Sequence, residues 1–301
     1  MPRIGSLGDL HLRASKPVHR IDKYYERQFE KLCFAFNEFK KNAVDFVLQP
    51  GDFFHDYGRD PYNIAYDAVA FLILHKIPVY LVFGQHDIKF HNTELTDIPI
   101  QILNKTSLIT QLSDVAIEPS RNVLVYGMNW NDKMPTNIDT SRKKFKILVM
   151  HKMVINRKKL WPEQTDYITA RDLAHSKFDL IVSGDNHKAF IYNNKVINCG
   201  SLMRMTTAQC KHKPMFAIYD TESQKLKKYE YPIESHDLVL KQNVKKQEEL
   251  LEAESHEVFA TSLDGKEFEG QLDYRANVHK VIKQRRCRQR TIEIIEEALS
   301  Q

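Results

Sequence analysis

The chain has 301 residues, of which 42% are hydrophobic and 28% are charged, and its formal net charge is +5 at pH 7. This composition is typical of an ordinary globular protein and excludes a disordered or collagen-like chain. The four cysteines are widely spaced, which argues against a disulfide framework and a cysteine zinc site. No signal peptide or membrane-length apolar stretch is recognised, so we expect a cytoplasmic protein without membrane contact.

Short apolar runs alternate with amphipathic segments in the first part of the chain. Residues 22–41 carry apolar side chains at intervals of three and four, which predicts a helix with one apolar stripe. The members of this stripe are Tyr25, Phe29, Leu32, Phe36 and Phe39. This alternation predicts a layered α/β fold. Its other predicted elements are strands at 4–7, 44–48 and 78–83 and a helix at 61–76.

The middle of the chain is richer in strands. We predict buried strands at 123–126, 145–150 and 178–183, with a short helix near 170–175. An antiparallel run follows, in which Asn193-Asn194 is a candidate turn. Its predicted strands are 189–192, 195–198, 215–219 and 226–231. The composition changes near residue 236, so we predict a domain of residues 1–235 and a small, mostly helical C-terminal extension of residues 236–301.

Five of the predicted strands end in acids or histidines, often beside a glycine. The clearest is the apolar run that ends in Pro50-Gly51-Asp52, because a buried strand that stops at Gly-Asp places a carboxylate at the carboxyl edge of a sheet. Each end alone is ordinary turn chemistry, and a single histidine is more often a surface or core residue. The ordered set nevertheless predicts one ligand cluster, formed by Asp9, His11, Asp52, Gln85, His151, Asp185 and His187.

Carboxylates and imidazoles together suit manganese, iron or zinc better than calcium. Asp52 is the candidate bridging ligand between two groups of side chains. One group is Asp9, His11 and His187, and the other is Gln85, His151 and Asp185.

Two metal ions about 3.5–4 Å apart activate a water for in-line attack on phosphorus. His86 lies next to a candidate ligand, and it is a candidate proton donor to the leaving oxygen or a stabiliser of phosphoryl charge. Asp87 is a candidate partner for a ring nitrogen. These two side chains complete a predicted catalytic site.

This ordered set of motifs resembles the calcineurin-like metallophosphoesterases, and within them the SbcD-type nucleases of DNA double-strand-break repair. The segment from Asn198 to Arg204, Asn-Cys-Gly-Ser-Leu-Met-Arg, is similar to the Gly-Ser…Arg segment of the SbcD-type enzymes. The resemblance covers about residues 3–235 and marks Ser201 and Arg204 as substrate-binding residues. It implies a four-layer α/β sandwich, with two central mixed β-sheets flanked by helices and the metals at one edge.

The resemblance also implies a function and partners. It implies exonuclease or endonuclease cleavage of DNA phosphodiesters with two divalent ions, manganese first and iron, zinc or magnesium as alternatives. An SbcC-type coiled-coil ATPase is the implied partner, and a homodimer is left open. Two alternatives remain. One is a phosphoesterase acting on a cyclic nucleotide or phosphoprotein, and the other is a metal-poor scaffold that recruits an ATPase.

Two positions depart from the family, which has Asn where this chain has Gln85 and His where it has Asp185. Both fall on the same metal in the family pattern. Glutamine is one methylene longer than asparagine, and the aspartate brings a negative charge in place of a neutral ring. We therefore expect a second metal of altered affinity or identity, with loss of that metal as the alternative.

The C-terminal extension carries a basic cluster on a predicted helix. Such a cluster fits contact with nucleic-acid phosphates, and a solvated helix is the alternative. Its candidate DNA-binding residues are Lys280, Lys283, Arg285, Arg286 and Arg288. The shortness of this extension suggests a compact, phage-encoded version of the family that works in the host cytoplasm.

Overall fold

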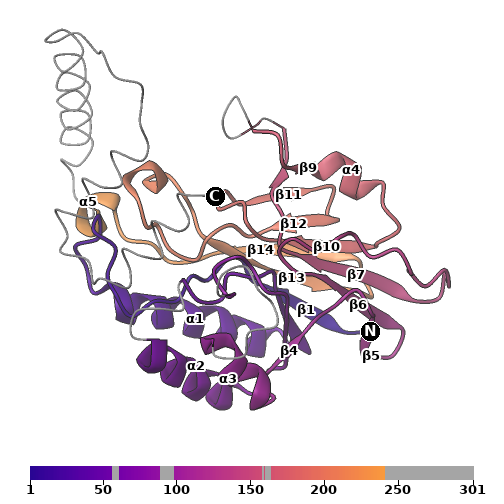
Figure 1. Cartoon of the computed structure of the whole chain (residues 1–301), viewed down its shortest axis with the longest axis horizontal. Helices are drawn as coiled ribbons and strands as arrows, with labels where there is room; N and C mark the ends of the chain where they lie inside the picture. Colours follow the sequence, from indigo (N-terminus) through magenta and orange to yellow (C-terminus); the bar gives the residue numbers. More distant parts are fainter. Residues whose placement is uncertain (56–60, 89–97, 158, 160–163, 241–301) are drawn as a thin grey trace, which may run out of the picture. The chain divides into compact units, whose positions relative to one another are not determined.

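The computed structural model describes residues 1–55, 61–88, 98–157, 159 and 164–240 (Figure 1). All of them belong to one compact unit, Met1–Gln242. The basic cluster from Lys280 to Arg288 lies outside the described residues, and so does nearly all of the predicted extension. The boundary at residue 236 therefore stays a prediction. Among the helices described here, none has the length and apolar character needed to cross a bilayer.

The first sheet has six strands in the order β14-β13-β1-β2-β3-β4. Strands β1 to β4 run parallel, whereas β13 pairs antiparallel with both β1 and β14, so the sheet is mixed. The strand bounds are β1 Arg3–Ser6, β2 Phe46–Gln49, β3 Val79–Leu81, β4 Ile109–Gln111, β13 Met215–Asp220 and β14 Lys225–Glu230.

The second sheet also has six strands, in the order β11-β12-β10-β7-β6-β5. Its central strands are parallel and its two edge strands antiparallel. The turn between β11 and β12 is made by Asn193 and Asn194, whose positive φ angles of 51° and 52° confirm the predicted turn. The strand bounds are β5 Ile117–Ser120, β6 Val123–Met128, β7 Phe145–Met150, β10 Leu180–Ser183, β11 Phe190–Tyr192 and β12 Val196–Asn198.

A small parallel pair, β8 (Val154–Ile155) and β9 (Ile168–Thr169), was not predicted. Two residues per strand are too few for a hydrophobic period to show in the sequence. The helices are α1 Tyr24–Lys41, α2 Pro61–His75, α3 Pro99–Lys105, α4 Ala170–Ala174 and α5 His236–Val239, with a 3-10 turn at Thr207–Gln209.

Helix α1 differs from its prediction in where its buried face begins. Tyr24 is buried and Tyr25 only partly, because the Tyr25 hydroxyl turns to the Asp67 carboxylate. Phe29 is also only partly buried and packs at the margin of the core, whereas Leu32, Phe36 and Phe39 are buried as predicted.

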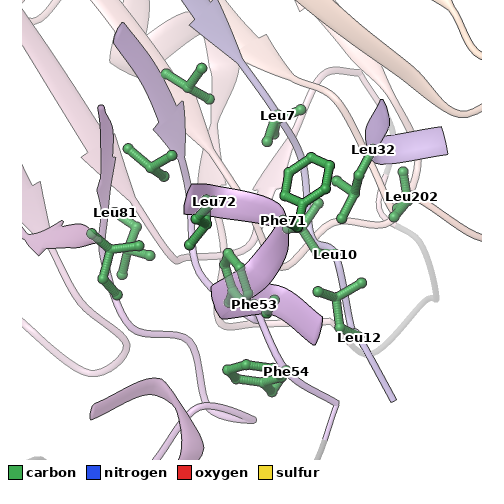
Figure 2. Packing of buried hydrophobic residues seen from close by; sticks show 14 of the residues in the cluster. Leu7, Leu10, Leu12, Leu32, Phe53, Phe54, Phe71, Leu72, Leu81 and Leu202 are labelled. Carbon is green, nitrogen blue, oxygen red and sulfur yellow. The ribbon is translucent and has the colours of Figure 1, made fainter. Parts of the chain in front are cut away.

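Alternate residues of the strands pack into different layers, as a period of two requires. In β7, Ile147 and Val149 belong to the cluster between the two sheets, while Leu148 and Met150 pack toward α4. On the other side, helices α1 to α3 cover the first sheet (Figure 1). Figure 2 shows part of this outer cluster, which includes Leu72 of α2 and Leu81 of β3. The predicted four-layer sandwich is therefore confirmed.

Candidate metal centre

The centre is built from loops that begin where the parallel strands end. Three of its non-glycine residues have left-handed backbone, with φ angles of 47° at His11, 51° at Asp52 and 72° at Asp185. Such conformations are uncommon for these residue types and cluster at functional sites. Two glycines allow the loops to close in: a Cβ on Gly84 would lie 2.2 Å from Oδ1 of Asp52, and one on Gly184 would lie 2.5 Å from Oδ1 of Asp9.

The first predicted ligand group comes together in the structure. Nε2 of His11 lies 3.0 Å from Nε2 of His187, and Nε2 of His187 lies 3.7 Å from Oδ2 of Asp9. One donor atom of each of these three side chains lies within 4.8 Å of the others. Two imidazoles and a carboxylate at this spacing can chelate a divalent transition metal.

The second predicted group also comes together. Oε1 of Gln85 lies 2.6 Å from Nε2 of His151, and the Gln85 amide donates to Oδ1 of Asp185 at 3.3 Å. Nδ1 of His151 donates to the carbonyl of Pro50 at 2.7 Å, which fixes the ring so that Nε2 faces the centre. Holding a ligand imidazole by its other nitrogen is typical of metal sites.

Asp52 lies between the two groups. Its Oδ2 atom is 3.5 Å from Nε2 of His11 and 3.5 Å from Nε2 of His151, while its Oδ1 atom accepts the backbone N–H of His86 at 2.9 Å. One carboxylate oxygen is thus anchored and the other faces both groups. This is the arrangement that a bridging ligand requires.

Two buried carboxylate oxygens of the centre support a cation site. Oδ1 of Asp9 and Oδ2 of Asp52 are buried and have no hydrogen-bond partner among the described residues. A buried carboxylate oxygen without a hydrogen bond is costly. A bound cation would satisfy both atoms, so the donor set fits divalent metal.

The electrostatics agree with this assignment. Burial alone would lower the pKa of His151, but the Asp52 carboxylate, together with Asp9 and Asp185, raises this pKa to about 10. Burial raises the pKa of Asp9, and Asp52 and Asp185 raise it further. The centre therefore holds a negative potential that favours cations, and a metal would bind His151 in its deprotonated form.

His86 faces this centre from the loop after β3. Its Nδ1 donates to the carbonyl of His55 at 2.7 Å, and its ring meets the His11 ring edge-on at 4.9 Å. Nε2 is thereby left for a substrate oxygen. A positioned imidazole of this kind can transfer a proton.

Asp87 has a different environment from the one predicted. Its buried carboxylate accepts the backbone N–H groups of Phe54 and Gly84, each at 3.0 Å, and no described contact joins it to an imidazole. Burial, with the nearby Asp52 charge, raises the pKa of Asp87 to about 7. Asp87 joins the loops that carry Asp52 and His86, so its place in the structure is that of a positioning residue.

His55 belongs to this cluster and was not predicted. Its Nδ1 lies 3.4 Å from Nδ1 of His11, and its ring stacks on that of His86 at 5.2 Å with an interplanar angle of 14°. His11, His55 and His86 form a further group, in which one ring nitrogen of each lies within 4.8 Å of the others. The sequence feature that could have indicated His55 was its position three residues after Asp52, in the same loop.

Ser201 and Arg204, the predicted substrate-binding residues, use their polar atoms elsewhere. The Ser201 hydroxyl donates to the Met203 carbonyl at 3.0 Å. The buried Arg204 guanidinium donates to the carbonyls of Cys210 and Glu234, at 3.3 and 2.6 Å. The segment still touches the centre through its backbone, because Ser201 bridges to Asp9.

A groove of about 630 Å³ opens beside the centre. Asp185 and His187 of the ligand cluster line it together with His212. Its other charged lining residues are Lys188, Lys211, Lys213, Lys228 and Glu230. Substrate approaching the metal ligands can therefore lie along a surface that is mainly positive.

A family model described as calcineurin-like phosphoesterase matches residues 2–189. A dimetal phosphatase from Danio rerio has 11% sequence identity and a TM-score of 0.48, covering 78% of this chain and 97% of its own. Another solved structure has 11% identity and a TM-score of 0.47, covering 77% of this chain and 100% of its own. No curated protein matches the chain.

Proposed function

The chain belongs to the calcineurin-like phosphoesterase family, and on this premise we propose that it is a metal-dependent nuclease that hydrolyses phosphodiester bonds in DNA. A phosphoesterase activity follows from the family and from the His/Asp groups that fit a metal site. The choice of DNA rests on one observation, the lysine-lined groove beside those groups.

The charges of the groove favour a polyanion. Lys213 and Lys228 approach Glu230, at 3.9 and 2.8 Å. Lys188 and Lys211 are exposed and have no carboxylate within 4 Å among the described residues. Positive charge that continues along a groove matches a backbone with several phosphates. A cyclic nucleotide or a single phosphorylated side chain presents one phosphate, which would contact only part of this lysine-lined groove.

The residues that would hold two divalent ions are Asp52 and the two groups on either side of it. Bound ions, with manganese as the first choice and iron, zinc or magnesium as alternatives, would supply Lewis acidity toward the phosphate and a nucleophilic water at neutral pH. The chain fixes the ligands in advance, since Asp52 is anchored by the His86 N–H and His151 by the Pro50 carbonyl.

The leaving oxygen needs a proton, and the contacts of His86 support this side chain as the donor. The bond from its Nδ1 to the His55 carbonyl holds the ring in one orientation, so Nε2 is the atom that carries the transferred proton. His55 stacks against the same ring and limits its rotation. We assign His86 as the general acid and His55 as a positioning residue.

The resemblance to SbcD-type nucleases extends the proposal to a partner, an SbcC-type coiled-coil ATPase, and to a role in DNA repair or recombination. The same resemblance extends the proposal to a homodimer. At the second ligand group, the Gln85–Asp185 hydrogen bond supports a site of altered metal affinity. Co-purification of the chain with an SbcC-type ATPase encoded in the same genome tests the partner.

The nuclease is tested with end-labelled double-stranded and single-stranded DNA in manganese. The informative variant is the double substitution Lys188→Met/Lys211→Met. We expect it to lose roughly tenfold in DNA cleavage. The slope of log cleavage efficiency against log salt concentration should become shallower by about one per lysine. Hydrolysis of bis(p-nitrophenyl) phosphate, which has one phosphate, should be unchanged.

The matched control is Lys105→Met/Lys133→Met, which removes the same charge from exposed lysines outside the groove. An equal loss in both double variants would show that only net charge matters. If the wild-type chain hydrolyses the small diester but cleaves no DNA, the polyanion assignment is wrong.

A further inference from the structure

A second, smaller cavity of about 210 Å³ lies between the start of α1 and the segment that follows β14. Its volume is enough for a tetrahedral oxyanion with several waters, since one water occupies about 30 Å³ in the liquid. The charged residues that line it are Arg20, Asp22, Arg27, Glu30, Lys31, Arg204 and Glu234. No residue of the predicted metal cluster is among them.

The acids of this cavity already have partners. Asp22 forms a two-point ion pair with Arg20, through Oδ1 at 2.8 Å and Oδ2 at 2.5 Å. Glu30 pairs with Arg27 at 2.7 Å, and Glu234 pairs with the same guanidinium. Each of the three acids therefore has an arginine partner, and Glu30 and Glu234 share one guanidinium. The lining carries four cations against three acids, so its net charge is +1.

Lys31 and Arg204 are the cations that remain. Neither has a carboxylate within 4 Å among the described residues. The Lys31 ammonium donates to the Leu202 carbonyl at 3.0 Å, and Arg204 donates to two backbone carbonyls. A lysine has three N–H donors and an arginine five, so both retain donors for a ligand.

An excess of positive charge in an enclosed place, carried by side chains without a close carboxylate, is costly. Arg204 is only 4% exposed. Burial, together with the charges of Arg20 and Arg204, lowers the pKa of Lys31 to about 7. An anion bound between the two side chains would remove this cost.

We propose that the cavity between Lys31 and Arg204 binds an oxyanion of the phosphate class, either free phosphate or the terminal phosphate of a nucleotide. The binding groups are the Lys31 ammonium and the Arg204 guanidinium. The site does not depend on the nuclease assignment, because it is defined by its own cavity and its own cations.

The cavity is linked to the metal centre by a short path. The Leu202 carbonyl accepts a hydrogen bond from the Lys31 ammonium. The Leu202 N–H donates to the carbonyl of Asp9 at 2.9 Å. Arg204 lies two residues further along the same segment. An anion in the cavity therefore fixes the segment that rests on a predicted metal ligand.

The test is a calorimetric titration of the full chain, with its metals, with inorganic phosphate at pH 7. Lys31→Met should bind phosphate at this site about tenfold more weakly or not at all, since a charge-assisted hydrogen bond is lost. Lys31→Arg, which keeps the charge, should retain binding. Lys41→Met, on the same helix but exposed and paired with Glu38, is the matched control.

Phosphate held at the metal centre contributes equally to the binding heat of all these proteins. The difference between Lys31→Met and Lys41→Met therefore isolates phosphate binding in the cavity. The proposal is overturned if the wild-type chain shows no difference from Lys31→Met. A second titration uses a deoxynucleoside 5′-monophosphate. Tighter binding than phosphate that also depends on Lys31 identifies a nucleotide phosphate as the ligand, and equal or weaker binding that depends on Lys31 identifies free phosphate.

Discussion

The Nε2 atoms of His11 and His187 lie 3.0 Å apart, although 176 residues separate the two histidines in the sequence. His11 follows β1 of the first sheet, and His187 follows β10 of the second. The candidate metal centre thus spans both sheets of the sandwich. Correct stacking of the two sheets is therefore a condition for the centre to form.

Asp52 faces both ligand groups, so its removal should affect metal binding and catalysis together. We expect Asp52→Asn to lower hydrolysis of bis(p-nitrophenyl) phosphate by about 10²–10³-fold or more and to reduce the metal content measured by mass spectrometry. Asp114→Asn, at an exposed carboxylate, is the control and should leave both unchanged. Full activity in Asp52→Asn would rule out the bridging role.

His86 should matter most when the leaving group needs a proton. His86→Asn is expected to slow DNA cleavage by about 10²-fold or more. It should slow hydrolysis of bis(p-nitrophenyl) phosphate far less, because p-nitrophenolate departs without protonation. His236→Asn, at an exposed histidine paired with Asp237, should change neither rate. Equal losses on the two substrates would argue for a role in binding and against proton donation.

Asp185 should control the second metal. Isothermal titration with manganese is expected to give two ions per chain for the wild type. Asp185→Asn should weaken binding of the second ion about tenfold or more and leave binding of the first ion unchanged. Asp166→Asn, whose side chain is 83% exposed and pairs with Lys152, is the matched control. A wild-type chain that binds a single ion would support the metal-poor alternative.

Lys31 should make stability depend on pH in a defined window. Its pKa is about 7 in the folded chain, against an ordinary value of 10.5. Below pH 7 the Lys31 side chain is protonated in both the folded and the unfolded chain. Between pH 7 and 10.5 it is protonated only in the unfolded chain, which therefore binds more protons. The free energy of unfolding contributed by Lys31 should therefore rise with pH across this window and be lowest below it.

This prediction is checked by urea unfolding at several pH values in phosphate-free buffer. The difference between wild type and Lys31→Met should show the rise, and the difference between wild type and Lys41→Met should be flat. A flat profile for both would mean that the Lys31 ammonium is not desolvated in the folded chain.

The sequence predicted the layers well because they follow from local patterns. The apolar run Phe145–Met150 was predicted as a strand, and the structure has the same bounds. Alternate side chains of this strand pack into two different layers. The helix predicted over residues 22–41 is α1, whose first buried side chain is Tyr24 and not Tyr25. That shift came from a tertiary contact, the Tyr25–Asp67 hydrogen bond.

The site was harder to predict because it depends on where the side chains point as well as on where the residues lie along the chain. Strand ends in the sequence indicated which residues lie at the sheet edge, and Asp9, Asp52 and His187 do meet there. Arg204 was marked as substrate-binding only by the resemblance of its segment to the SbcD-type enzymes, and its guanidinium lines a separate cavity. His55 carried no strand-end signal of its own and joins the cluster only through the fold of its loop.

The sequence alone determined the α/β class, the order of the strands along the chain and the kinds of donor atom available, because hydrophobic period and turn chemistry act over a few residues. The tertiary structure decided which donors meet, which cations lack a partner and where the lysine-lined groove runs. Those relationships join segments that are far apart in the chain, and they arise only when two sheets pack face to face and bury the side chains between them.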